Sequence, residues 1–182
     1  IKDNSGAMIE INSERDFVAR NELFQSFVKT CSELVLSSKN DIDVLQNLPF
    51  PNANRSVNEE LINNIATIGE NMNIRRAEYL EVSKGTLISY VHNNVAEGLG
   101  RLGVLVALES GVQNNDVKEI GKQIAMHIAA TSPKSVNIED LDPEVVERER
   151  QVLIDQAMSS GKPKEIAEKM VQGRMHKFFQ EV

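Results

Sequence analysis

The chain has 182 residues, 41 % of them apolar, and a net charge of −7 from 20 Lys and Arg against 27 Asp and Glu, so it can form one or two globular domains with a core. Because a protein that binds phosphate backbones needs clustered cations interleaved with aromatic rings, this acidic chain without tryptophan is expected to have no direct nucleic-acid partner. The single cysteine, Cys31, excludes an internal disulfide and a multi-cysteine metal site, and no apolar run approaches the roughly 20 residues of a membrane span, so we expect a cytosolic protein without metal, cofactor or membrane partner.

The N-terminal segment is predicted to run from a strand straight into a helix. The chain begins at Ile1 without Met or a signal-peptide pattern, inside what reads as a strand pairing across residues 3–6 with residues 7–11, so we expect a fragment. Ser13 then opens a Ser-x-x-Asp capping box, which can satisfy the free N–H groups of a first helical turn. Residues 15–18, which we call the tip, would lie on that turn.

Helical periodicity predicts that Phe17 is buried in the core. One stripe of a helix over residues 14–37 contains an apolar series: Phe17, Phe24, Val28, Cys31 and Val35. On this reading Phe17 belongs to the core and Asp16 is only a helix cap.

A loop and a second helix follow. Residues 47–54 contain two prolines and three asparagines, which is typical of a loop. Ser56-x-x-Glu59 is another capping box and predicts a helix to about Ile68. Gly69 is the expected stop, because glycine enters the left-handed conformation without a Cβ clash.

Three strands and a helix are predicted next. Residues 74–82, 86–92 and 102–109 are too short or too alternating for helices, and glycines separate them. The segment 102–108 is the most apolar and is expected to be central in its sheet. Residues 115–131 have apolar positions at helical spacing, with a buried face that requires a sheet.

The C-terminal part is predicted to be helical. Asp142-Pro143 is a strong helix start, Gly161 follows its end at Ser160, and Pro163 begins another helix. The order of elements indicates the α+β class: two small antiparallel sheets, each packed with helices, ending in a long helical segment.

Four stretches resemble the elongation factor Ts family. Residues 10–20, Glu-Ile-Asn-Ser-Glu-Arg-Asp-Phe-Val-Ala-Arg, are similar to the family's core signature, whose usual form has Thr where this chain has Arg15. Further likeness occurs in order at residues 68–76, 124–130 and 160–171. The resemblance implies an N-terminal core subdomain over 1–81 and a C-terminal one over 82–182 that includes the start of a helical hairpin, without the family's N-terminal helical module and C-terminal tail.

The resemblance also implies a function. Members of this family promote guanine-nucleotide exchange on elongation factor Tu, binding its GDP-bound and nucleotide-free forms without bond chemistry. In the family the Asp-Phe pair wedges into the partner beside its nucleotide-bound magnesium, and two other points touch the nucleotide domain. By position, the partner-binding residues are Arg15, Asp16, Phe17, Val18, Ile68, Gly69 and His92.

Several of these positions have plainer interpretations. In an Ile-Gly pair at a helix end, the isoleucine is most often a core residue and the glycine most often caps the helix. A lone histidine in a strand most often makes a structural hydrogen bond. We expect His92 to be exposed at the end of its strand, on the same side as Asp16 and Phe17. His127 and His176 lack ligand-spaced partners and receive structural roles.

The sequence also leaves open two other functions, a hydrolase and an adaptor, and the surroundings of Arg15. A hydrolase using Asp16 and His92 as an acid–base pair lacks a nucleophile motif and a glycine-rich phosphate loop. A non-exchanging adaptor would use the same surface, and a homodimer stays open. Arg15 places a cation at the positive end of a helix, so a compensating acid, Glu14 or Asp16, is expected nearby, with the guanidinium pointing outward.

Overall fold

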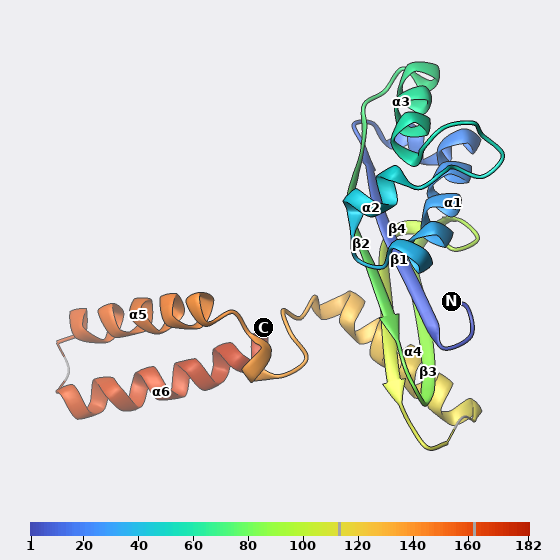
Figure 1. Cartoon of the computed structure of the whole chain (residues 1–182). Helices are drawn as coiled ribbons and strands as arrows, with labels where there is room; N and C mark the ends of the chain where they lie inside the picture. The colour runs from blue at the N-terminus through green and yellow to red at the C-terminus, as the bar shows by residue number, and fades with distance from the viewer. Residues whose placement is uncertain (113, 162) are drawn as a thin grey trace. The chain divides into compact units, whose positions relative to one another are not determined.

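The computed structural model describes residues 1–112, 114–161 and 163–182 (Figure 1). Lys162, which belongs to the fourth family-like stretch, lies outside the described residues. The chain forms two compact units, Ile1–Ala130 and Thr131–Val182. The subdomain boundary expected at residues 81/82 falls within the first unit.

The first unit confirms the predicted α+β class. It contains two antiparallel sheets of two strands each, one joining β1 and β2 and the other joining β3 and β4. In chain order, its elements are β1 (Ser5–Ser13), the 3-10 helix η1 (Asp16–Arg20), α1 (Glu22–Ser38), α2 (Ile42–Asn47), α3 (Val57–Ile68), β2 (Met72–Glu81), β3 (Gly85–Ala96), β4 (Leu99–Glu109) and α4 (Asn115–Thr131).

The main core lies between the β1–β2 sheet and helices α1 to α3 (Figure 1). Alternation along β1 turns Ala7, Ile9 and Ile11 toward these helices. Phe27 of α1 is 1 % exposed and stacks on Phe50 with ring centroids 5.7 Å apart. The buried side chains of this core are Val18, Phe24, Phe27, Cys31, Val35, Leu45, Val57, Leu61, Met72, Ile74 and Ala77.

The two sheets meet through the other face of β1. A Cβ added at Gly103 of β4 would lie 2.6 Å from the sulfur of Met8, and one added at Gly6 would lie 3.0 Å from Leu105. Glycine at position 103 therefore permits an approach that a larger residue would prevent without displacement.

The second sheet packs its remaining face against α4. Val104 and Val106 of β4 form a small core with Ala125 of α4. Because β4 is covered on one face by α4 and on the other by β1, its segment 102–108 has no polar side chain. The expectation of a central strand over 102–108 is therefore wrong: the sheet has two strands, and burial on both faces explains the pattern.

The N-terminal segment differs from two expectations. Residues before β1 form only a single bridge, between Lys2 and Ser5, while β1 itself pairs with β2. Ser13 does not cap a helix: it pairs with Met72 at the end of the sheet, and its hydroxyl donates to the Arg15 carbonyl at 3.3 Å. Strand pairing thus extends through the residue that was expected to begin the helix.

The predicted helix over 14–37 is interrupted at Asn21. After η1, the Asn21 side-chain oxygen accepts hydrogen bonds from the Leu23 and Phe24 amides, at 2.9 and 3.3 Å, and starts α1. The short helix α2 was not predicted. Its signal is Asp41, whose carboxylate accepts a hydrogen bond from the Val44 amide at 2.9 Å.

Helix α3 follows its prediction closely. Ser56 and Glu59 form the complete capping box, and Gly69 ends the helix in the left-handed region with φ 78°. Helix α4 has the predicted bounds, and the three later strands are present but longer than predicted.

The second unit is a helical hairpin, as predicted. It contains a 3-10 turn η2 (Ile138–Asp140), α5 (Pro143–Ser159) and α6 (Lys164–Glu181). Asp142 caps α5 by accepting from the Glu144 amide at 2.9 Å. The two helices enclose Leu153, Ala157, Val171 and Met175. Among the described residues, none of the helices combines the length and apolar character needed to cross a membrane.

Candidate functional site

The tip follows β1 and points two consecutive side chains in opposite directions, one into solvent and one into the core. Val18 is completely buried in the main core, whereas its neighbour Phe17 is 56 % exposed. The 3-10 geometry of η1, together with the break at Asn21, takes Phe17 off the helical stripe that would have buried it. The core role predicted for Phe17 from periodicity is therefore wrong.

Val18 requires the opposite correction. It was expected on the partner-binding surface, but its side chain has no exposed area and cannot touch a partner in this conformation. It anchors the tip to the core instead. Phe17 is held outward because the residue after it is held inward.

Arg15 binds an acid that sequence reasoning did not name. Its Nη1 lies 3.4 Å from Oε1 of Glu70, and its guanidinium carbon lies 6.0 Å from the centre of the Phe17 ring. The expected compensating acid was Glu14 or Asp16. The side chain of Arg15 remains 68 % exposed, so the pair leaves it largely in solvent.

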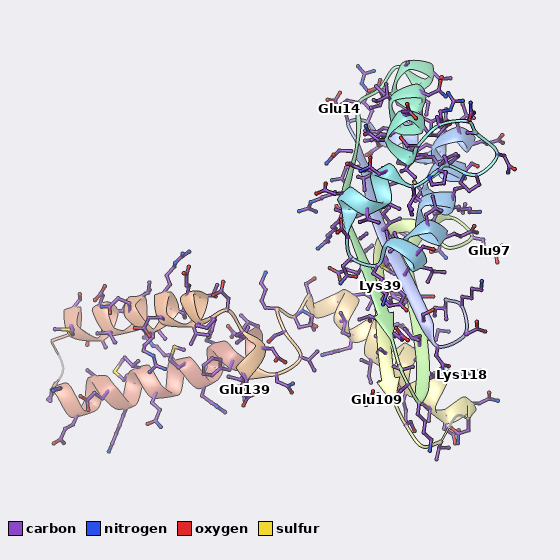
Figure 2. All side chains as sticks on the ribbon, in the orientation of Figure 1. Glu14, Lys39, Glu97, Glu109, Lys118 and Glu139 are labelled. Atoms are coloured by element: carbon purple, nitrogen blue, oxygen red, sulfur yellow. The ribbon has the colours of Figure 1, made fainter. Side chains whose placement is uncertain are left out.

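Asp16 is also paired across the fold. Its Oδ2 lies 3.1 Å from Nη2 of Arg101 on β4, and its side chain is 89 % exposed. This contact links the tip, which extends from the first sheet, to the second sheet. Figure 2 marks the neighbouring Glu14 near one end of the first unit, away from Glu109 and Lys118 at the other end.

Ile68 and Gly69 lie next to the residue that binds Arg15. Ile68 is partly buried against the main core, whereas Gly69 is exposed at the end of α3. Glu70 follows directly. The Arg15–Glu70 ion pair therefore brings the tip and the end of α3 together, as two of the expected partner-binding points.

We expect Gly69→Ala to lower the free energy of unfolding of the first unit by about 1–2 kcal/mol, because an alanine there must adopt the left-handed conformation. Apart from Gly69 itself and its two chain neighbours, no described heavy atom lies within 4 Å of the added Cβ, so the cost is conformational. Urea unfolding measures it. Gly173→Ala inside α6, where the Cβ is also unobstructed, should instead stabilise its hairpin by about 0.5–1 kcal/mol. An unchanged Gly69→Ala protein would show that the left-handed cap does not persist in solution.

His92 is exposed, but its position differs from expectation. It lies within β3, four residues before the strand ends at Ala96, and its Nδ1 is 2.9 Å from the Tyr90 hydroxyl. It pairs with Leu102, on the face that packs against α4. Arg101 is the neighbour of Leu102, so strand alternation directs it to the opposite face. His92 and Asp16 therefore do not share one side of the second sheet.

Other titratable groups have structural roles within their own units. Partial burial raises the pKa of Glu10, but the hydrogen bonds and charges of Arg75 and Arg76, each 2.7 Å away, outweigh it and hold the pKa below its usual range. Burial raises the pKa of the Cys31 thiol to about 12, which makes it an inert core residue. His176 lies 3.3 Å from Gln180. In residues 1–112, 114–161 and 163–182, no group of three or more His, Cys, Asp or Glu side chains could hold a metal ion.

Sequence reasoning missed Glu70 and Arg101. Neither shares a helical or strand period with the tip, so no local pattern joins them to it. Glu70 could have been considered because it follows Gly69, whereas nothing in the sequence pairs Arg101 with Asp16.

The fold and the site define an α+β protein that displays a short charged and aromatic tip from the end of a two-stranded sheet. A family model described as elongation factor TS matches residues 14–182. The chain is 53 % identical over 178 residues to elongation factor Ts of Rhodospirillum centenum, and 50 % identical over 181 residues to that of Rhizorhabdus wittichii. These matches cover 98 % and 100 % of this chain, but 58 % and 59 % of the two relatives. The chain belongs to the elongation factor Ts family.

Proposed function

We propose that this chain is the core of a guanine-nucleotide exchange factor that acts on elongation factor Tu during protein synthesis in the cytoplasm. The observation that carries the proposal is the outward Phe17, flanked by the charged Arg15 and Asp16 and anchored by the buried Val18. A half-exposed phenylalanine next to a residue that is buried in the core is suited to enter a partner's apolar pocket, since aromatic anchors dominate the energetics of many interfaces.

Exchange of this kind requires no bond chemistry. A protein that binds nucleotide-free elongation factor Tu more tightly than the GDP-bound form must, by thermodynamic linkage, weaken GDP binding by the same factor. Phe17 would repack the wall of the nucleotide site, and Asp16 would change the charge around the magnesium ion that the partner holds. Ile68 and Gly69, next to Glu70, would extend the contact surface from the tip.

The test is release of labelled GDP from purified elongation factor Tu, with and without this chain. We expect release to become faster and to saturate as the chain is added. No acceleration at concentrations where a binding assay shows a complex would contradict the proposal.

That contrary result would favour the second candidate, a non-exchanging adaptor that uses the same surface. The observation in its favour is that both charged tip residues already have partners, with Arg15 on Glu70 and Asp16 on Arg101. Tight binding to elongation factor Tu with GDP release unchanged separates the adaptor from the exchange factor.

A further inference from the structure

Two ion pairs hold the tip from opposite directions. Arg15 is bound by Glu70, which follows the end of α3, and Asp16 is bound by Arg101 on β4. The two partner residues come from different elements, Glu70 from the turn between α3 and β2 and Arg101 from β4. Within the part of the chain that the structure describes, no side chain caps the first turn of η1, so the N–H groups of that turn gain no capping hydrogen bond.

The backbone of η1 is also held by hydrogen bonds, including one from the Gln25 side-chain amide to the Ala19 carbonyl at 2.8 Å. The Val18 amide donates to the Arg15 carbonyl at 3.2 Å, and the Asn21 amide donates to the Val18 carbonyl at 2.9 Å. A short 3-10 turn of this kind has poorer hydrogen-bond geometry than an α-helix and opens easily. The side-chain ion pairs restrict the two residues that enter this turn.

In the Asp16–Arg101 pair both side chains are exposed, 89 % and 63 %, whereas in the Arg15–Glu70 pair Arg15 is 68 % exposed and Glu70 is only 11 % exposed. Pairs with such exposed members are individually weak. Their effect is on order rather than on global stability. A binding loop that is already held in its bound conformation loses less conformational entropy on association, so its affinity is higher.

We propose that Arg101 and Glu70 are positioning residues that preorganise Arg15, Asp16 and Phe17 for the partner. Arg101 acts on Asp16, and Glu70 acts on Arg15. The inference rests on the proposed exchange function for its kinetic consequence, but the ordering of the tip in the free protein can be measured independently.

The first measurement is hydrogen exchange at the Val18 and Asn21 amides of the free chain, followed by NMR. Arg101→Ala is expected to speed exchange at both amides about two- to fivefold, the range that corresponds to losing one exposed ion pair. Arg101→Lys, which keeps the charge, should restore part of the protection. Raising the salt concentration should reduce the difference between wild type and Arg101→Ala, because salt screens an exposed pair.

The second measurement is GDP release from elongation factor Tu over a range of chain concentrations. Arg101→Ala is expected to raise the half-saturating concentration about two- to fivefold and leave the maximal rate unchanged, because the positioned groups themselves are intact. Glu70→Gln should act in the same direction, and the double variant should show the product of the two effects.

Arg75→Ala is the matched control. Arg75 is 57 % exposed and paired with Glu10 at 2.7 Å, and Arg76 remains to bind that carboxylate when Arg75 is replaced. It should change neither measurement.

Unchanged amide exchange in both Arg101→Ala and Glu70→Gln overturns the proposal. A raised half-saturating concentration with unchanged amide exchange also overturns it, since it would assign Arg101 a direct contact with the partner. If the wild-type chain fails to accelerate GDP release, the proposed function fails, while the amide measurement still decides whether the tip is held by these pairs.

Discussion

Phe17→Ala is expected to slow stimulated GDP release by about 30-fold or more at subsaturating concentration, with little change in stability. Removal of an aromatic anchor from the centre of an interface costs about 2 kcal/mol or more in binding, which corresponds to that factor. The side chain is 56 % exposed in the free chain, so its truncation should lower the free energy of unfolding by no more than about 1 kcal/mol.

Two measurements on the same protein decide this prediction: the rate of labelled GDP release and the free energy of unfolding in urea. Leu23→Ala is a suitable control, because Leu23 is 52 % exposed and lies just beyond the tip, on α1. It should leave exchange within about twofold of wild type, as expected of residues outside an interface centre. A large loss of stability in Phe17→Ala, with exchange per folded molecule unchanged, would show that Phe17 acts as a core residue.

Phe27→Ala is expected to have the reverse profile. Phe27 is 1 % exposed and stacks on Phe50, so truncation removes buried surface and leaves a cavity beneath α1. Such substitutions cost about 3–5 kcal/mol, a large share of the roughly 5–15 kcal/mol that holds a typical domain folded. Exchange activity per folded molecule should change little, because the tip is anchored through Val18 at another point of the core.

Urea unfolding and near-ultraviolet circular dichroism measure the loss. Phe27→Leu provides the graded comparison, since leucine fills part of the space and should lose less stability. If Phe27→Ala and Phe17→Ala destabilised the chain equally, the distinction between a buried and a presented phenylalanine would not hold in solution.

The two Ser-x-x-acid patterns show how far local sequence determines the fold. At Ser56 the pattern forms a complete capping box, because the preceding loop leaves the backbone free to begin α3. At Ser13 the same pattern fails, because β1 continues its pairing with β2 through Ser13 and Met72. A partner strand distant in sequence therefore overrides the local signal, and no helical window contains that information.

The candidate site was accessible to sequence reasoning only in part. Periodicity assigned Phe17 to the core, and only the family resemblance pointed to its projection from the surface. The contact of Arg15 with Glu70 depends on where α3 ends beside the tip, and that of Asp16 with Arg101 depends on the packing of the two sheets; residue patterns specify neither. The fold class was predictable because three local signals recur along the chain and agree with one another: alternating apolar residues in strands, capping residues at helix starts and glycines at helix ends.

The contact between Gly103 of β4 and Met8 of β1 helps to set the distance between the two sheets. Phe17 extends from the first sheet and His92 from the second, and the two sheets approach each other where position 103 lacks a side chain. A larger residue at position 103 would meet the Met8 side chain, so either that side chain or the separation of the two sheets must change. The spacing with which this molecule could meet a partner therefore depends on the missing side chain at position 103, which belongs neither to the tip nor to the surface around His92.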